Sequence, residues 1–99
     1  MRDITIKADH SGNKGRYVAR VAGAEDEAEL TFSRASDRLI IVDHTGVPDS
    51  LRGKGLAAAL AARAIEDARA AGTRIMPLCP FFRAYAMRHR AQVEDVVDL

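Results

Sequence analysis

The segment RGKG, residues 52–55, places two glycines around a lysine, immediately before a run rich in alanine. Glycine has no Cβ, so a backbone that contains it can approach a bulky ligand closely. The start of a helix exposes unpaired N–H groups and a partial positive charge, and the side chains of Arg52 and Lys54 would add full charges beside it. This pattern predicts a phosphate-binding loop. A loop that uses Gly53 and Gly55 only for their backbone angles is the alternative.

Two widespread phosphate-binding motifs fit this loop poorly. The spacing between Gly46 and Gly53 is too long for a P-loop, and Gly55 stands where that loop needs serine or threonine. The dinucleotide pattern G-x-G-x-x-G/A is met formally by Gly53, Gly55 and Ala58. The strand expected after the helix ends in Pro-Leu-Cys, however, and lacks the acidic residue that a dinucleotide site requires.

Short strands are predicted before the loop. Residues 3–8 alternate apolar and polar side chains, as in a half-buried strand, and the turn-forming residues 9–15 predict a hairpin loop. Residues 16–22 and 28–33 predict two further strands. Residues 38–43 are apolar on both faces, which favours a central strand.

The period of the apolar residues changes after the loop. Between residues 53 and 71 they recur at the spacing of one helix face, and a glycine follows as the expected helix end. Residues 73–79 predict a short strand that Pro77 interrupts, and residues 80–91 predict a second helix. The order ββββαβα predicts an α+β fold, with one mixed sheet of about five strands and two main helices packed on it, in a single domain over residues 1–99.

The composition excludes several classes of protein. The 15 basic and 14 acidic side chains leave a net charge of +1, which does not favour nonspecific nucleic-acid binding. No apolar run is long enough to span a membrane, and the N-terminal residues lack the apolar segment of a signal peptide. A single cysteine excludes an internal disulfide, and no Cys/His spacing indicates a metal site. The sequence therefore predicts a cytoplasmic protein without a metal.

Two segments together resemble a known family. HTGVPDSLRGKGLAAAL, residues 44–60, and PLCPFFRAYAMRH, residues 77–89, resemble the GCN5-related N-acetyltransferases, as does the AELTF strand. The chain is most similar to the minimal single-domain subgroup, which has a cysteine after the fifth strand. The resemblance covers nearly the whole chain and implies transfer of an acetyl group from acetyl-CoA to an amine.

The resemblance implies a site for acetyl-CoA as the co-substrate. The residues that would hold its pyrophosphate are Arg52, Gly53, Lys54, Gly55, Leu56 and Ala57, and Val47 would lie on the strand edge along which pantetheine runs. Ser50 stands where the wider family has Gln or Arg, a departure that concerns one side chain and not the backbone amides. By the resemblance, residues 1–99 are expected to correspond to the minimal domain, without the additional elements that shape the acceptor pocket in larger members. The acceptor could therefore be a protein lysine or a small amine.

Cys79 is the candidate nucleophile. Pro80 disfavours helical angles at the residue before it, so Cys79 is expected to be the N-cap of the last helix, where the helix dipole favours a thiolate. In the cleft that the resemblance implies between the fourth and fifth strands, this thiolate would accept the acetyl group and pass it to the amine. A buried, inert thiol and a cleft-lining thiol that takes no acyl group are the alternatives.

Direct transfer would use other side chains. The resemblance places Tyr85 near the family's general-acid tyrosine, although the sequence also allows it to pack on the sheet. His44 closes the fourth predicted strand and would lie across the cleft from the fifth. It would serve as a base for the amine, a partner for Cys79 or a structural hydrogen-bonding group. Arg88 and His89 lie on a basic helix surface, from which either could reach a phosphate of CoA.

The sequence and the resemblance together predict an acetyl-CoA-dependent N-acetyltransferase that is a monomer or a weak homodimer. A noncatalytic module that binds or senses acyl-CoA is the alternative from another class, and acetylation of amines would separate the two. A third hypothesis is a domain whose basic residues 83–90 contact RNA or a protein. The balanced net charge counts against nucleic acid.

Overall fold

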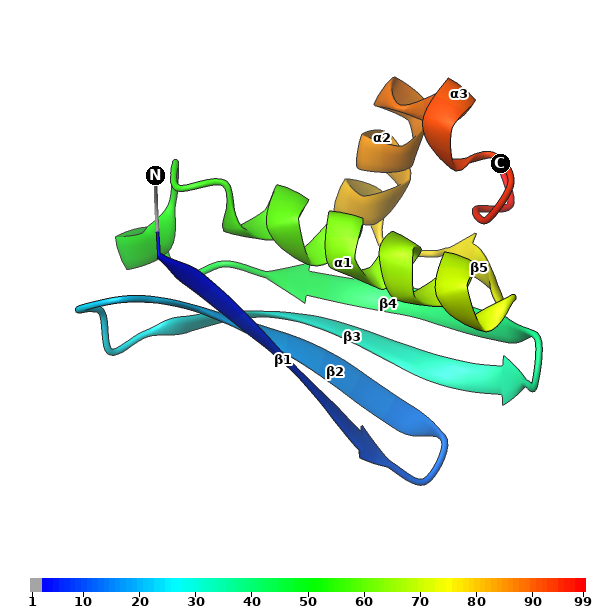
Figure 1. The fold of residues 1–99 in the computed structure, drawn as a ribbon. Coiled ribbons are helices and arrows are strands. Elements are labelled where there is room, and N and C mark those ends of the chain that lie inside the picture. Colours follow the sequence, from blue (N-terminus) through cyan, green and yellow to red (C-terminus); the bar gives the residue numbers. More distant parts are fainter. Residues whose placement is uncertain (1–2) are drawn as a thin grey trace.

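The computed structural model describes residues 3–99 as one five-stranded sheet with helices on one face (Figure 1). The elements are β1 (Ile4–Ser11), β2 (Lys14–Val21), β3 (Glu27–Ser36), β4 (Leu39–Gly46), the 3-10 turn η1 (Asp49–Leu51), α1 (Leu56–Ala71), β5 (Arg74–Pro77), α2 (Pro80–Arg88) and α3 (Arg90–Val93). The strands lie in the order β1-β2-β3-β4-β5; the first four are antiparallel neighbours, and β5 is parallel to β4. The predicted α+β fold is confirmed.

Several predicted boundaries shift. The hairpin loop predicted over residues 9–15 is only two residues long, because the β1–β2 register continues to the pair of Ser11 and Lys14. The first long helix begins at Leu56 and not at residue 53, because the glycines before it have left-handed backbone angles. The second helix ends at Arg88, where His89 leaves helical angles and separates it from the short α3.

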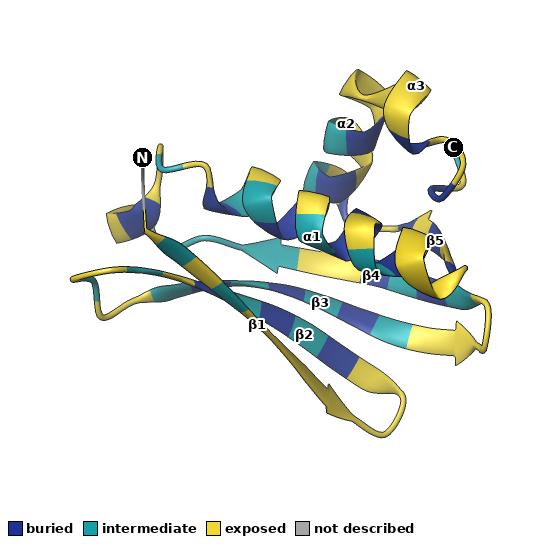
Figure 2. Ribbon diagram, in the orientation of Figure 1, coloured by how far each residue is buried: buried dark blue, intermediate teal, exposed yellow. Residues whose placement is uncertain are grey.

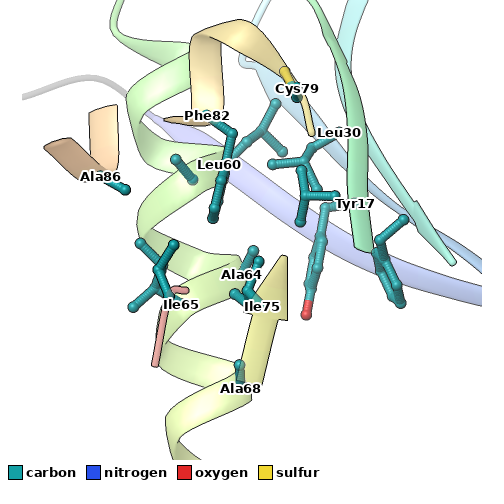
Figure 3. Close-up of a cluster of buried hydrophobic side chains, with 14 of the residues drawn as sticks. Tyr17, Leu30, Leu60, Ala64, Ile65, Ala68, Ile75, Cys79, Phe82 and Ala86 are labelled. Carbon is teal, nitrogen blue, oxygen red and sulfur yellow. The ribbon is translucent and has the colours of Figure 1, made fainter. Parts of the chain in front are cut away.

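The core lies between the sheet and the helices. Alternate residues of β2, β3 and β4 are buried under α1 and α2, so dark stripes cross the sheet in Figure 2. On α1 the facing residues include Leu60, Ala64 and Ala68, and small alanines allow the helix to approach Leu30 and Tyr17 (Figure 3). The core is therefore a single layer of side chains on one side of the sheet.

The hydroxyl of Tyr17 holds α1 over the sheet. It donates to Asp67 Oδ2 at 2.8 Å, and Arg63 Nε donates to the same oxygen at 3.0 Å. The guanidinium carbon of Arg63 also lies 5.7 Å from the centre of the Tyr17 ring. Burial and the Asp67 carboxylate raise the pKa of Tyr17 far above its usual value, so the hydroxyl stays a donor.

Gly15 leaves space for an aromatic ring in the β2–β3 pair. A Cβ at this position would lie 2.3 Å from Cζ of Phe32, which faces Gly15 in the register. We expect Gly15→Ala to lower the free energy of unfolding by about 1–3 kcal/mol, because the ring must move within a packed core. Denaturant titrations measure the loss. In a Phe32→Leu background the penalty should shrink, and an equal penalty in both backgrounds would contradict this steric explanation.

The segment after α3 adds an unpredicted bridge to the sheet. Val97 pairs in parallel with Ile75 of β5, with Ile75 N–H donating to Val96 O at 2.8 Å and Asp98 N–H to Ile75 O at 2.9 Å. The ion pair of Arg74 with Asp98 fixes the same segment. The outer edge of β5 is therefore covered. Within residues 3–99, no helix has both the length and the apolar character needed to cross a membrane.

Candidate functional site

The loop before α1 places two glycines where other residues would be strained. Gly53 and Gly55 have φ angles of 76° and 78°, in the left-handed region. Gly55 is the N-cap of α1, so it offers no side chain to the helix, and the first turn of α1 contains no acidic residue. The positive end of the helix dipole is therefore not offset within its own first turn.

A hollow of about 300 Å³ lies at this helix start, and we call it the glycine-loop hollow. Its lining residues are Val47, Leu51, Arg52, Gly53, Gly55, Leu56, Ala57, Ala58, Phe81 and Arg88. Six of the seven residues expected to contact acetyl-CoA are in this set. Lys54 instead lines a neighbouring hollow of about 520 Å³, together with Ser50 and residues of the β2–β3 turn.

Helix α2 supplies the far wall of the glycine-loop hollow. Phe81 and Arg88 belong to α2 and lie beside residues of the glycine loop, although they are distant in the sequence. The sequence indicated Arg88 through the basic helix surface. It gave no signal for Phe81, because an aromatic residue in a predicted helix is typical of the core. The hollow thus contains two arginines, of which Arg52 forms an exposed ion pair with Asp49 at 3.0 Å. That pair is weak in water and leaves Arg52 able to rearrange.

The segment that enters the loop is tied to the β2–β3 turn, which lies at the same end of the sheet. In the 3-10 turn, Leu51 N–H donates to Pro48 O at 2.9 Å, and Arg52 N–H donates to Asp49 O at 3.2 Å. The hydroxyl of Ser50 donates to Asp26 in the β2–β3 turn. The residue that departs from the wider family's pattern therefore anchors this loop to a neighbouring turn.

Strands β4 and β5 part beside this hollow. Their pairing runs from Leu39 with Arg74 to Val42 with Pro77 and then ends, as the proline predicts. The N–H groups of Leu78 and Cys79 both donate to Val42 O, at 3.0 and 2.9 Å. The last four residues of β4, 43–46, have no β5 partner in the described chain. A one-residue bulge opposite Thr31 and Phe32 adds a bend at the same point.

Cys79 lies at the point where the strands part. It is the N-cap of α2, with φ −68° and ψ 124°, and Pro80 follows at the first helical position, as predicted. The residue is 3% exposed, and its Sγ donates to Oγ1 of Thr45 at 3.3 Å. Cys79 and Leu30 both belong to the buried core cluster (Figure 3). Thr45 was not singled out from the sequence, because a threonine near a strand end has no distinguishing pattern.

His44 lies on the other face of the sheet. In the register His44 faces Thr31 and Thr45 faces the buried Leu30, and successive side chains of a strand point to opposite faces. A Cβ built on Gly46 would lie 3.0 Å from Nε2 of His44, which agrees with residues 44 and 46 sharing a face. The structure therefore brings Thr45, and not His44, to the thiol of Cys79.

Tyr85 lies one turn of α2 beyond the buried Phe82. Its ring is half-buried and packs against the edge of the core, and it contacts the ring of His89, with 4.4 Å between the ring centres. Neither ring has a hydrogen bond to Cys79 in the described part of the chain. Across residues 3–99, no cluster of three or more His, Cys, Asp or Glu side chains could hold a metal ion.

Comparison with known proteins agrees with this architecture. The model of the GCN5-related N-acetyl-transferase family matches residues 16–96, and the chain belongs to that family. The protein NATD1 of Bos taurus is 34% identical and that of Homo sapiens 33% identical over 61 residues, which are 62% of this chain and 54% of each relative. The match thus spans about half the length of these relatives.

A solved structure is also similar. The solution NMR structure of a GCN5-like protein from Staphylococcus aureus superposes with a TM-score of 0.62 at 26% identity, over 93% of this chain and 87% of that one. Membership of the family associates the chain with acetyl transfer in general, and the family generally uses acetyl-CoA.

Proposed function

We propose that this protein is an acetyl-CoA-dependent N-acetyltransferase whose acceptor is an amine, either a protein lysine or a small molecule. The observation that carries the proposal is the position of the glycine-loop hollow. It opens at the start of α1, next to the last residues of β4, where β5 no longer pairs. A phosphate group and an extended chain would therefore find adjacent binding surfaces.

The glycine loop would hold the pyrophosphate of CoA. The first amides of α1, those of Leu56 and Ala57, lie at the positive end of a 16-residue helix, which favours an anion. Arg52 and Arg88 add positive charge from two sides of the hollow, and Phe81 adds an apolar wall. Lys54 lines the neighbouring hollow and would contribute through its charge from outside.

The unpaired end of β4 would bind the pantetheine arm. Residues 43–46 are extended backbone that β5 does not use, and pantetheine carries two amides in an extended chain. Such a chain can add to a strand by hydrogen bonds between amides. Val47 follows this stretch and also lines the glycine-loop hollow, so it would lie between the pyrophosphate and the pantetheine. The thioester would then point toward the region of Cys79 and Thr45.

Two routes of transfer fit the site. In the direct route the amine nitrogen attacks the thioester carbon, the C–S bond breaks, and the CoA thiolate takes a proton while the amine loses one. Tyr85 would donate a proton to the CoA thiolate. His44, on the other face of the sheet, would accept the proton that the amine loses. In the covalent route Cys79 first takes the acetyl group and releases CoA, and the amine then attacks the new thioester.

The structure also provides an argument for the noncatalytic alternative. The thiol of Cys79 is buried on Thr45, and the ring contact of Tyr85 is with His89. A protein that only binds or senses acyl-CoA needs the glycine-loop hollow but no acid or base at the thiol. Acetylation of an amine is therefore the observation that separates the two functions.

Mass spectrometry with acetyl-CoA tests these proposals. Under native conditions we expect a noncovalent complex with the parent protein and also with Cys79→Ala. If the covalent route operates, an acetyl group survives denaturation in the parent and is absent in Cys79→Ala. Thr45→Val is the matched control, because it removes the partner of the thiol and keeps the thiol itself.

The possible results separate direct transfer, the covalent route and noncatalytic binding. A complex without a covalent adduct, together with acetylation of a lysine peptide or a polyamine by Cys79→Ala, would establish direct transfer. A complex without any acetylated amine would favour the acyl-CoA-binding alternative. Absence of any complex with acetyl-CoA would overturn the proposed function.

A further inference from the structure

The two edges of the sheet are protected very differently. The edge strand β5 has four residues, ends in Pro77 and is bridged by Val97 on its outer side. The other edge strand, β1, has eight residues without proline or glycine, and its register with β2 contains no shift. In the described chain no strand pairs with its outer side, which is open in Figure 1; one long hydrogen bond reaches it, from Arg63 Nη1 to the outward carbonyl of Ile6 at 3.5 Å. Long, regular edges of this kind are templates for another strand.

The backbone groups that face outward on β1 can be identified. Ala22 N–H donates to Asp3 O at 3.1 Å, so the pair of residues 3 and 22 is a hydrogen-bonded pair. In an antiparallel ladder such pairs alternate, so the odd-numbered residues of β1 turn their N–H and C=O groups toward β2. Ile4, Ile6, Ala8 and His10 therefore present theirs to the outside.

The side chains of β1 are complementary to themselves in a two-fold pairing that uses most of the strand. If Ala8 faces Ala8 of a second copy, then Lys7 faces Asp9 of that copy and Asp9 faces its Lys7. These two pairs fall at non-hydrogen-bonded positions, where facing side chains are closest. A lysine normally discourages edge pairing, but here the aspartate two residues further on makes the strand complementary to itself.

The other two-fold registers have like charges opposite each other or are short. A pairing centred on Thr5 places Lys7 opposite Asp3 of the second copy, but it uses only the first few residues of the strand. A pairing centred on Lys7 or on Asp9 places two like charges opposite each other. A pairing centred on Ile6 places Asp9 opposite Asp3 of the second copy, and one centred on His10 uses only the last few residues of the strand. Both Lys7 and Asp9 are exposed in the structure, so neither must leave a buried contact to pair.

We propose that β1 is a homodimerisation edge, on which two copies of this chain pair antiparallel about Ala8 to form a continuous ten-stranded sheet. The pairing is independent of the proposed transferase activity. Strand β1 lies at the opposite edge of the sheet from β4 and β5, so the glycine-loop hollow stays open in both copies. One pair of strands is a small interface, and the dimer should be weak, with a Kd between about 10 µM and 1 mM.

Sedimentation equilibrium over a range of concentrations tests this interface by charge reversal. Lys7→Glu and Asp9→Lys should each raise the Kd at least about tenfold, because both symmetric pairs change from attraction to repulsion. The double variant Lys7→Glu/Asp9→Lys restores opposite charges across the interface and should return the Kd to within about threefold of the parent. A dimer Kd that is unchanged in the two single variants, or a Kd that is not restored in the double variant, would overturn the proposed register.

Backbone variants test the pairing itself. Ala8→Pro removes an N–H that points outward, so it should abolish the dimer without removing a bond to β2; Ala8→Val, which keeps the N–H, is the matched control. Circular dichroism verifies that each variant folds. Amide exchange of the parent should slow with concentration at Ile6, Ala8 and His10 and stay unchanged at Lys7. A parent protein that is monomeric up to about 1 mM would overturn the proposal.

Discussion

Gly53→Ala is expected to raise the Kd for acetyl-CoA by at least about tenfold, which corresponds to 1.4 kcal/mol or more. A Cβ on Gly53 would meet no atom of the protein within 4 Å, so it would project into open space. Because Gly53 lines the glycine-loop hollow, that space is where we propose that the pyrophosphate binds. Alanine at a φ of 76° also costs about 1–2 kcal/mol of strain, which would draw the loop away from its ligand-binding shape. Isothermal titration with acetyl-CoA measures the change.

Gly72→Ala is the matched control for this experiment. Gly72 caps the other end of α1, has a φ of 71°, and a Cβ there would also meet nothing within 4 Å. Both substitutions therefore impose similar backbone strain on the same helix, but only one lies at the hollow. We expect similar losses in the free energy of unfolding and a weaker complex only for Gly53→Ala. Equal affinities for acetyl-CoA in the two variants would contradict the proposal that the pyrophosphate binds at this loop.

The adjacent residues Phe81 and Phe82 should have opposite roles. Phe82 is 0% exposed and lies among Leu30 and Leu60, which join α2 to the sheet and to α1 (Figure 3). Phe82→Ala is expected to lower the free energy of unfolding by about 3–5 kcal/mol, because it leaves a large cavity in the core. Domains of this kind have about 5–15 kcal/mol in total, so the variant would lose a large share of its stability. Urea titrations measure the loss.

Phe81→Ala provides the contrast on the same turn of α2. Phe81 is half-buried and lines the glycine-loop hollow, so its loss should cost only about 1 kcal/mol of stability. The Phe81→Ala variant should bind acetyl-CoA more weakly. The Phe82→Ala variant should bind acetyl-CoA as the parent does under conditions in which it is folded. Phe81→Ala could instead keep the parent affinity for acetyl-CoA and lose as much free energy of unfolding as Phe82→Ala. In that case α2 would only pack on the core and would not form a wall of the site.

The fold could be predicted from the sequence where one periodicity governs a whole element. The two-residue alternation of the strands and the helical spacing after residue 55 each reflect burial on one face, and both appear in the structure. The exact ends were less predictable, because hydrogen-bond registers and backbone angles set them. The β1–β2 hairpin closed further than its turn-forming residues indicated, and the bridge of Val97 to Ile75 depends on tertiary packing that no local pattern encodes.

The candidate site was predictable in its backbone and less so in its side chains. Glycines before a long helix indicated the loop, and a proline after a cysteine indicated the N-cap of α2, since both are local effects. Which side chain would face Cys79 depends on the bulge in β4, which changes the face on which each following residue lies. Thr45 therefore contacts the thiol, and His44 points elsewhere. Phe81 was missed because its neighbour Phe82 carries the same apolar signal.

The parallel pairing of β4 with β5 has a consequence for how the molecule assembles. Strands β1 to β4 join neighbours along the chain, so each hairpin closes only a short loop. Strand β5 reaches β4 only after the whole of α1 has crossed the sheet, which is the longest closure among the strand pairs. The folding barrier should therefore concentrate on this crossover, and the junction that bounds the glycine-loop hollow would be the last part of the sheet to form and the first to open.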